Sequence, residues 1–462
     1  MRQIRTKESL DKNLRYIAEA VAAEGGRAYF VGGCVRDKFL GRENKDIDIE
    51  IYGIEADKID AILRRRFRVE VVGKSFGVWI LKGCDIDVSM PRRERKMGEG
   101  HKAFEIDGDP FMSPVEACRR RDFTINSMLE DILSGEIVDP FGGLEDMRKK
   151  ILRHTSERFS EDPLRVLRAM QFAARFDFDV AGETVDLCAK IPFENLPMER
   201  VFEEWKKMIL KGVAISKGLN FLRDCGWVKY FPELCACVGC QQDKQWHPEG
   251  DVYAHTGYCM DCFARERVGD EREDLVVGLA VLCHDMGKPL CTTHDPDGHI
   301  RSHGHDILGV KPAERFLGRI TREKALIAEV LPLVKRHMAI LDLWRNKSGD
   351  SAIRRLAREV VRIDRLVRVD SADRGGRPPI VPEPSPQGLW ILERAKILAV
   401  QDSAPKPILQ GRHLIEMGLK PSPRFSGILS AAYEAQLDGE IFDIDSARDF
   451  ARKLLENDET LN

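Results

Sequence analysis

The chain has 462 residues, with 73 Lys and Arg against 76 Asp and Glu, and it contains 12 cysteines. Its length exceeds what one hydrophobic core usually holds, so we expect three or more domains. Because the charges nearly balance, any bound nucleic acid must be held by local basic patches. The sequence lacks an apolar stretch of membrane-span length and the apolar core of a signal peptide, which argues against a membrane or secreted protein. We therefore expect a cytoplasmic protein whose scattered cysteines are reduced thiols.

The first informative segment lies near the N-terminus. A short apolar run, residues 29–31, predicts a strand, and Gly32 and Gly33 predict a turn in which backbone N–H groups can approach a ligand. Arg36 follows, and its guanidinium is a planar fork of donors that suits phosphate oxygens. Together these features predict a phosphate-binding loop, although a plain turn has the same glycine pattern.

The next segment, residues 45–50, alternates charged and apolar side chains (KDIDIE). Alternation along a strand places Asp46 and Asp48 on one face, while Ile47 and Ile49 face the core. Two carboxylates on a rigid strand suit Mg²⁺ when substrate phosphates supply the remaining ligands. The segment therefore predicts a metal site, with a charge cluster on an edge strand as the alternative.

Four further motifs follow in order along the chain. They are CDIDV at 84–88, RRRDFTIN at 119–126, DPFGGL at 139–144 and FSEDPLRVLR at 159–168. With the two segments above, this set resembles class II template-independent nucleotidyltransferases, the family of CCA-adding tRNA nucleotidyltransferases and bacterial poly(A) polymerases. The resemblance covers residues 25–235. A polar loop at 92–109 also resembles the family's flexible loop associated with addition of the final A, which disfavours an enzyme that adds only CC.

The resemblance implies roles for individual residues. The residues that it assigns to nucleotide binding are Gly33, Arg36, Arg121, Asp122, Asp162, Arg165 and Arg168. It assigns Asp46 and Asp48 to catalytic Mg²⁺, with Asp87 as a candidate third carboxylate. In the family, the residues that match Asp162 and Arg165 offer hydrogen-bonding groups to the Watson–Crick edge of the incoming nucleotide, so that the protein replaces a template.

Local spacing gives Asp162 and Arg165 a second interpretation. The apolar pattern predicts a helix over 161–176, with Ser160 as its N-cap and Pro163 in its first turn. Helix spacing would then bring Asp162 and Arg165 side by side as an ordinary i,i+3 ion pair. The resemblance favours the role in nucleotide selection.

A separate group of metal-ligating residue types lies further along the chain. His255, His284, Asp285 and Asp373 resemble the four-ligand pattern of the HD metal-dependent phosphohydrolase superfamily, and some bacterial CCA-adding enzymes carry such a domain in this position. Imidazole and carboxylate together suit a divalent transition metal and its activated water. Further histidines lie nearby in the sequence and leave the ligand set open: His303, His305 and His337.

Two weaker patterns have ordinary alternatives. The four cysteines at 237, 240, 259 and 262 have a spacing that a zinc ribbon could use, but buried thiols explain them better because Cys259 and Cys262 closely follow His255. A stripe of arginines at 354, 358, 362 and 365 has the spacing of one helix face. Such a stripe is usually solvated, and RNA contact is the alternative.

The predicted fold class is α+β, with a small mixed-sheet nucleotidyltransferase head followed by an extended helical body. We expect the head at 1–150, a helical nucleotide-selecting neck and body at 151–243, an HD phosphohydrolase-like domain at 244–378 and a helical tail with possible tRNA contact at 387–462. Prolines between 378 and 386 indicate a linker before the tail.

The leading functional hypothesis is template-independent addition of CCA to the 3′ end of tRNA from CTP and ATP, with Mg²⁺-dependent nucleotidyl transfer and release of pyrophosphate. The HD site would add a phosphohydrolase that acts on RNA ends. The expected partners are tRNA, CTP and ATP, with no membrane and no obligate protein partner evident. Poly(A) polymerase and A-only addition on the same scaffold stay open, as does an RNA-binding HD phosphohydrolase with an inactive head.

Overall fold

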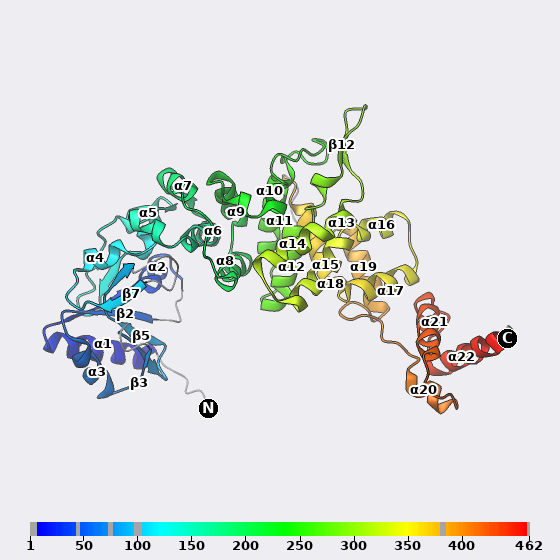
Figure 1. The fold of residues 1–462 in the computed structure, drawn as a ribbon, viewed down its shortest axis with the longest axis horizontal. Coiled ribbons are helices and arrows are strands. Elements are labelled where there is room, and N and C mark those ends of the chain that lie inside the picture. The colour runs from blue at the N-terminus through cyan, green and yellow to red at the C-terminus, as the bar shows by residue number, and fades with distance from the viewer. Residues whose placement is uncertain (1–6, 43–46, 73–76, 97–103, 379–384, 460–462) are drawn as a thin grey trace. The chain divides into compact units, whose positions relative to one another are not determined.

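The computed structural model describes residues 7–42, 47–72, 77–96, 104–378 and 385–459. The chain forms two compact units. The first consists of Met1–Glu204 with Phe221–Trp227, and the second of Trp205–Asn220 with Val228–Asn462. A sheet-containing first unit followed by a largely helical second unit confirms the predicted α+β class (Figure 1). The finer division into four domains stays a prediction.

The first unit is built on a mixed sheet of seven strands. Its spatial order is β3-β4-β5-β2-β1-β8-β9, and only the β2–β5 pair is parallel. The strand bounds are β1 Arg27–Val31, β2 Ile47–Tyr52, β3 Arg68–Val72, β4 Val78–Lys82, β5 Ile86–Ser89, β8 Leu129–Asp131 and β9 Ile137–Val138.

Two helices cover one face of this sheet, α1 (Lys7–Ala23) and α3 (Ala56–Arg64) (Figure 1). Alternation along the strands explains the arrangement, because Ile49 and Val88 are fully buried in the core beneath these helices. The alternate residues of β2 and β5 therefore lie on the opposite face of the sheet. That face carries the polar side chains of the candidate site.

The rest of the first unit contains short helices, a hairpin and two parallel two-residue strands. The helices are α2 Gly33–Phe39, α4 Pro114–Arg119, α5 Gly143–Arg148, α6 Leu164–Phe176 and α7 Gly182–Ala189; the hairpin is β6 Arg92–Lys96 with β7 Phe104–Gly108, and the short strands are β10 Ile151–Leu152 and β11 Asp179–Val180. The prediction of a loop over 92–109 is therefore wrong for the described part of that segment. Helices α8 (Met198–Lys211) and α9 (Ile215–Asp224) have residues in both units.

The start of α6 differs from the sequence-based prediction. A 3-10 helix, Glu157–Glu161, precedes α6, and Ser160 Oγ donates to the Glu157 carbonyl instead of capping α6. The Asp162 carboxylate accepts the Leu164 N–H at 3.0 Å and so satisfies a backbone donor at the helix start. The prediction of a helix from 161 with a Ser160 cap was wrong because Asp162 takes that role locally.

The second unit consists mainly of helices. They are α10 Pro232–Cys235, α11 Val252–Arg265, α12 Glu271–Cys283, α13 His305–Leu308, α14 Val310–Ile320, α15 Lys324–Arg336, α16 Ala339–Arg345, α17 Asp350–Val360, α18 Ile363–Gly375, α19 Pro386–Ile397, α20 Gly411–Glu416, α21 Arg424–Asp438 and α22 Ile444–Glu459, with one hairpin of β12 Thr292–His294 and β13 Ile300–Ser302. Helix α12 packs against α11, α15 and α18 and is almost entirely buried. Helices α20–α22 have a small core of their own.

The predicted arginine stripe at 354–365 does not lie on one helix. Val361, with φ of 61°, ends α17, so the four residues are divided between α17 and the start of α18. Their guanidinium groups are engaged within the unit: Arg354 with the Leu437 carbonyl, Arg358 with Glu434, Arg362 with Asp364 and Glu273, and Arg365 with Glu273 and Glu329. The stripe contributes to helix packing.

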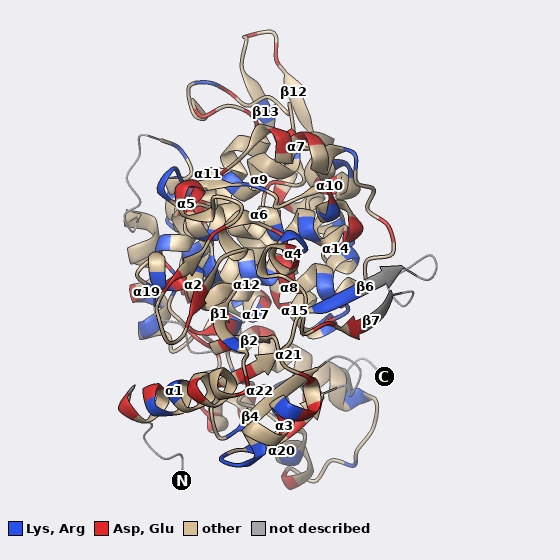
Figure 2. Ribbon diagram, turned by 90° about the vertical axis from the view of Figure 1, so that its left-hand side faces the viewer, with Lys and Arg blue, Asp and Glu red and all other residues tan. Residues whose placement is uncertain are grey.

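Basic and acidic residues are interspersed along most of the described chain (Figure 2). This distribution agrees with the near-balanced net charge. Among the described residues, no helix combines the length and the apolar character that crossing a membrane would require.

Candidate functional site

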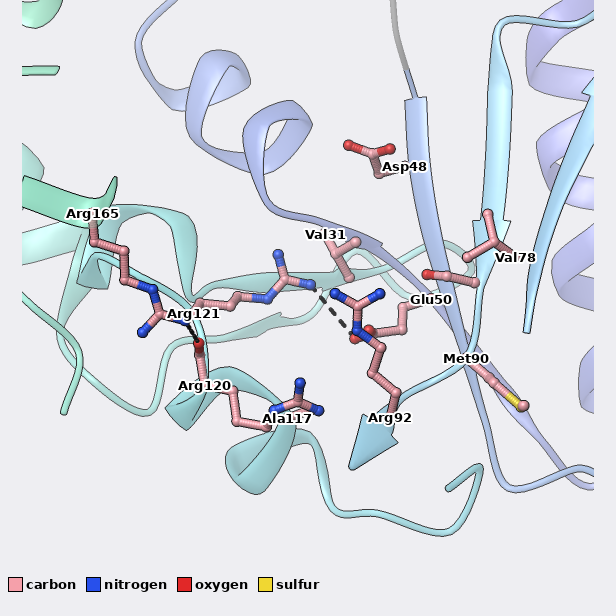
Figure 3. Close-up of a pocket in the computed structure, with 11 residues that line it drawn as sticks. Val31, Asp48, Glu50, Val78, Met90, Arg92, Ala117, Arg120, Arg121 and Arg165 are labelled. Atoms are coloured by element: carbon pink, nitrogen blue, oxygen red, sulfur yellow. Dashed lines mark hydrogen bonds and ion pairs between the residues drawn. The ribbon is translucent and has the colours of Figure 1, made fainter. Parts of the chain in front are cut away.

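Two adjoining pockets lie on the polar side of the sheet in the first unit, with volumes of about 350 and 460 Å³. Both are lined by Asp48, Arg120, Arg121 and Arg165. Figure 3 shows arginines from several elements around the first pocket, together with Asp48 and Glu50 on β2, and the Arg121 guanidinium points toward Glu50. Guanidinium groups opposite carboxylates form a setting in which a polyanion and a divalent cation can bind together.

The acidic side of the site is formed by neighbouring strands. In the register of the two parallel strands, Asp48 on β2 lies beside Asp87 on β5, and Glu50 lies beside Ser89. Because the strands are paired in register, these side chains project from the same face. Asp48 and Asp87 are both exposed. Asp46, the other predicted metal ligand, lies outside the described residues.

The glycine turn lies close to Arg121. Gly32 has φ of 66°, and a Cβ on this residue would lie 2.9 Å from Arg121 Nη1. A side chain here would be strained and would displace the arginine. Gly33 begins α2 and, like Gly32, lines the second pocket.

Arg36 lines the second pocket but is mostly buried beneath it, with 5% exposed. Its Nε donates to Asp37 at 2.8 Å and its Nη1 to Asn126 Oδ1 at 2.7 Å. Its guanidinium also lies over the rings of Phe172 and Phe176. These contacts fix the orientation of the guanidinium, so Arg36 forms a rigid part of the pocket floor.

Arg121 and Asp122 are held in different ways. Arg121 lines both pockets, and its guanidinium lies 3.6 Å from the Glu50 carboxylate (Figure 3). Asp122 is buried, accepts from Asn126 Nδ2 at 2.9 Å and pairs with Arg168 Nη2 at 2.6 Å. Burial favours the neutral form of Asp122, but Arg168 and Asn126 hold the pKa of its carboxyl below the usual value. The Asp122–Arg168 pair is therefore ionised and orients Arg168 in the pocket wall.

Asp162 and Arg165 both line the second pocket, but they do not pair with each other. Asp162 Oδ2 accepts from Arg200 Nη2 at 3.0 Å. Arg165 donates to the backbone carbonyls of Arg158 and Arg120, each at 2.8 Å. The i,i+3 ion pair, the alternative interpretation from local spacing, does not form, and each side chain is instead oriented by a partner from elsewhere in the unit.

A second group of functional side chains lies in the core of the second unit. It contains all four residues of the predicted HD pattern. His255 Nε2 lies 3.0 Å from Asp373 Oδ1 and 3.7 Å from Asp285 Oδ2, and His284 Nε2 lies 3.2 Å from Asp285 Oδ2. His255, His284 and Asp285 are almost completely buried.

Backbone and carboxylate acceptors fix the tautomers of these histidines. His284 Nδ1 lies 2.7 Å from the Val281 carbonyl, and His255 Nδ1 lies 2.7 Å from Glu249 Oε1. Since these oxygens only accept, each Nδ1 carries a proton, and Nε2 is the ring atom of each histidine that faces the carboxylates of the cluster and would bind a metal ion after losing any proton that it carries. His284 Nε2 is buried and has no hydrogen-bond partner. This is the arrangement expected of histidines that bind a metal ion.

Two of the additional histidines contact the other oxygen of Asp285. Asp285 Oδ1 lies 3.3 Å from His305 Nε2 and 4.0 Å from His337 Nε2, so these three residues form a second group that could hold a metal ion. His303 is in neither group. Burial, with His284 and His305 nearby, lowers the pKa of His337 to about 4, so this imidazole is neutral near pH 7.

The acidic members of the cluster are ionised. Burial works against ionisation of Asp285, but His284 and Lys288 hold the pKa of its carboxyl well below the usual value. Asp373 behaves in the same way: Arg377 and the hydrogen bond from His255 outweigh its burial and keep its pKa low. Buried anionic carboxylates beside imidazole lone pairs form a donor set that fits a divalent transition metal.

Comparisons with known proteins agree with the fold and with the arrangement of the head. A family model described as the Poly A polymerase head domain matches residues 28–153. The Multifunctional CCA protein of Xanthomonas campestris pv. campestris (strain B100) is 33% identical over 363 residues, covering 76% of this chain and 85% of that protein. The Multifunctional CCA protein of Acinetobacter baumannii (strain AYE) is 33% identical over 394 residues, covering 81% of this chain and 91% of that protein.

The chain belongs to the multifunctional CCA protein family.

Solved structures of two CCA-adding enzymes have the same overall fold as this chain. The crystal structure of the Bacillus stearothermophilus CCA-adding enzyme in complex with CTP has a TM-score of 0.67 at 22% identity and covers 98% of this chain and 100% of that one. The Thermotoga maritima CCA-adding enzyme complexed with tRNA has a TM-score of 0.60 at 20% identity and covers 98% and 97%. The predicted resemblance to CCA-adding nucleotidyltransferases is therefore confirmed.

Sequence reasoning missed several residues of this CCA family site. Glu50 could have been found, because it continues the alternation of Asp46 and Asp48 along the same strand. Arg120 and Arg92 line the first pocket; Arg120 lies in the RRRDFTIN motif, where only Arg121 and Asp122 were assigned a role, and nothing in the local pattern of Arg92 distinguishes it from other surface arginines. Arg200 is 38 residues from its partner Asp162, and no local signal points to it.

The structure also bears on the four cysteines with zinc-ribbon spacing. Among the described residues, the candidate metal groups contain only one of them, Cys259, and it lies with His255, His284 and Asp373. Cys237 and Cys240 have other neighbours, the Glu233 carbonyl and the Thr292 hydroxyl. The four thiols therefore do not form a zinc-ribbon site.

Proposed function

We propose that this chain adds C, C and A to the 3′ end of tRNA, with CTP and ATP as donors, at the arginine-lined pockets beside Asp48. The observation that carries the proposal is the position of Asp48 on the wall shared by both pockets, opposite Arg120, Arg121 and Arg165. The relatives named for CCA addition support this activity over poly(A) synthesis, A-only addition or an inactive head. A cytoplasmic location is part of the proposal, because tRNA maturation takes place where tRNA is used.

Divalent metal ions are general to nucleotidyltransferases, and we assign Mg²⁺ here to Asp46 and Asp48. Carboxylate oxygens on a sheet face that opens into the pocket fit this hard cation, and Asp87 is the third candidate because it adjoins Asp48. When bound, Mg²⁺ lowers the pKa of the attacking 3′-hydroxyl and neutralises the leaving pyrophosphate.

The remaining chemistry depends on positioning by the chain itself. The Gly32–Gly33 turn leaves room for the triphosphate, and Arg36 and Arg121 supply fixed positive charge beside it. Nucleotidyl transfer is an in-line displacement, so a triphosphate held against this wall presents its α-phosphorus to the RNA 3′-oxygen. Pyrophosphate then leaves on the arginine side of the pocket.

Nucleotide selection is assigned to Asp162 and Arg165. The Asp162 carboxylate provides acceptors and the Arg165 guanidinium provides only donors, so the two side chains form a fixed pattern for a base edge. Arg168, held by Asp122, shapes the adjoining wall. A base that mismatches the pattern leaves polar groups unpaired, and this carries the discrimination.

The test uses purified full-length protein with three RNAs: tRNA lacking CCA, tRNA ending in CC, and an unstructured RNA. Each RNA is incubated with CTP, ATP or both. We expect CCA on the first, a single A on the second and no extension of the third. Extension of unstructured RNA with ATP alone would instead identify a poly(A) polymerase. Extension of tRNA ending in CC, without extension of tRNA lacking CCA, would identify an enzyme that adds only A.

The buried cluster of His255, His284, Asp285 and Asp373 favours a second activity. We propose a metal-dependent phosphohydrolase that acts on RNA ends carrying a 2′,3′-cyclic phosphate or a 2′-phosphate. Pockets of about 480 and 300 Å³ open beside the cluster and are lined in part by Arg377, and the second also by Lys288. These cations suit a phosphate ester next to the metal site. Removing a blocking phosphate would free the terminus for nucleotide addition.

A further inference from the structure

A cysteine outside the predicted ligand pattern lies among His255, His284, Asp285 and Asp373, which we call the HD cluster. Cys259 is one helical turn after His255 on α11, so the two side chains lie on the same face of the helix. It is completely buried, and its Sγ lies 3.3 Å from His255 Nε2, the nitrogen that faces Asp373 and Asp285. The thiol therefore adjoins the metal-facing atom of this histidine.

The local packing brings the sulfur into this position. A Cβ on Gly376 would lie only 2.3 Å from Cys259 Sγ, so glycine after α18 is what allows the two segments to approach so closely. Asp373 lies on α18 near its end and reaches His255 from the same side. The approach of α18 to α11 thus assembles a sulfur, an imidazole nitrogen and a carboxylate oxygen together.

The separations between donor atoms match those around one metal ion. Donor atoms of His255, Cys259, His284 and Asp373 all lie within 4.8 Å of one another. Bonds of about 2.0–2.3 Å at angles between octahedral and tetrahedral place adjacent donors about 3.0–3.6 Å apart. The His255–Cys259 and His255–Asp373 separations of 3.3 and 3.0 Å fall in this range, and His284–Asp373 at 3.9 Å is slightly wider.

A neighbouring cysteine, Cys262, provides a comparison with a buried thiol outside the cluster. Cys262 is on the same helix and is 2% exposed, but it is in none of the candidate metal groups. Burial alone therefore does not distinguish Cys259. The buried His284 Nε2, which has no hydrogen-bond partner and belongs to the same group, is an independent observation that suits a cation-binding site.

We propose that Cys259 is a thiolate ligand of the HD metal ion, completing a set with His255, His284 and Asp373. The inference rests on the proposed metal centre and specifies which ions it selects. On metal binding the thiol loses its proton to solvent, and the sulfur electron pair forms the bond to the metal. A thiolate is a soft ligand, so this centre selects borderline transition metals such as Co²⁺, Ni²⁺ or Zn²⁺ over Mg²⁺.

The test is Co²⁺ titration of chelator-treated full-length protein, followed by near-ultraviolet absorption. The first equivalent of Co²⁺ is expected to give a thiolate-to-cobalt charge-transfer band in the parent and in the matched control Cys262→Ser. Cys259→Ser should lose the band and bind Co²⁺ at least about tenfold more weakly, since even partners outside the ligand set contribute about 10–100-fold. CCA addition by the head serves as the folding check for each variant.

The outcomes separate this inference from the proposed function. Co²⁺ binding by the parent without the band, or a band that persists in Cys259→Ser, overturns the thiolate ligand while leaving the metal centre in place. The first of these results needs no variant, so a misfolded substitution cannot mask it. If His284→Ala with Asp285→Ala binds Co²⁺ as tightly as the parent, the metal centre itself is wrong.

Discussion

The two candidate sites of this chain are built in opposite ways. In the head, the carboxylates are exposed on an open sheet face and the arginines approach from other elements of the unit. In the HD cluster, the histidines are buried and their Nδ1 atoms are fixed by acceptors. This difference fits our proposals that the nucleotide and its metal ions complete the head site, and that the HD cluster holds a resident ion.

We expect the largest effect from a substitution that inactivates the head and leaves the HD cluster intact. Asp48→Ala, like Asp46→Ala, should reduce nucleotide addition by about a thousandfold or more, since metal stabilisation of phosphoryl transfer contributes several kcal/mol. HD phosphohydrolysis and tRNA binding should persist, because Asp48 is exposed and not part of the core. Primer extension on tRNA lacking CCA measures the effect, with Asp57→Ala on α3 as the surface control. Substantial residual addition by Asp48→Ala would sink the assignment of the metal site.

The converse change inactivates the HD cluster and leaves the head intact. His284→Ala with Asp285→Ala should abolish metal-dependent hydrolysis of 2′,3′-cyclic or 2′-phosphate ends, because it removes a nitrogen ligand and the carboxylate that faces both metal groups. CCA addition should continue at the parent rate. His294→Ala on the exposed β12 hairpin is the matched control. If the double variant hydrolyses these ends as the parent does, the cluster has only a structural role.

A smaller effect concerns nucleotide choice within the head. Asp162→Ala and Arg165→Ala should change the preference for CTP and ATP over GTP and UTP by about tenfold to a hundredfold, the cost of leaving one polar group unpaired. Competition assays with all four nucleotides measure this ratio, and Glu161→Ala, an exposed neighbour, is the control. A lower rate with unchanged preference would mean that the two residues only support the pocket.

The head also shows how far sequence reasoning reaches. The alternation at 45–50 predicted a strand with acidic residues on one side, and β2 has Asp48 outward and Ile49 in the core, because a period of two is a local property. The partner of Asp162 could not be predicted, since Arg200 reaches it only through the packing of α8. Local spacing suggested Arg165 instead, whose guanidinium donates to backbone carbonyls.

The HD cluster shows a similar limit of sequence reasoning at Cys259. The resemblance supplied the four residues of the predicted ligand set across widely separated segments. Cys259 was interpreted as a buried thiol in preference to a zinc-ribbon ligand, because its approach to Asp373 depends on the packing of α18 against α11. The local signals that could have suggested its place in the cluster are its spacing of one helical turn from His255 and the glycine at 376.

The smallest expected effect tests Arg200 as a positioning residue for Asp162. Its Nη2 lies 3.0 Å from Asp162 Oδ2, but its side chain is 43% exposed, so solvent screens the pair. Arg200→Ala should therefore change nucleotide preference by only about two- to fivefold, with Arg200→Lys intermediate and Glu199→Ala unchanged. If Arg200 acts through Asp162, combining Arg200→Ala with Asp162→Ala should add nothing to Asp162→Ala alone. Additive effects on the preference ratio would show that Arg200 contacts the nucleotide or RNA directly, and the wall of the pocket would then extend to α8.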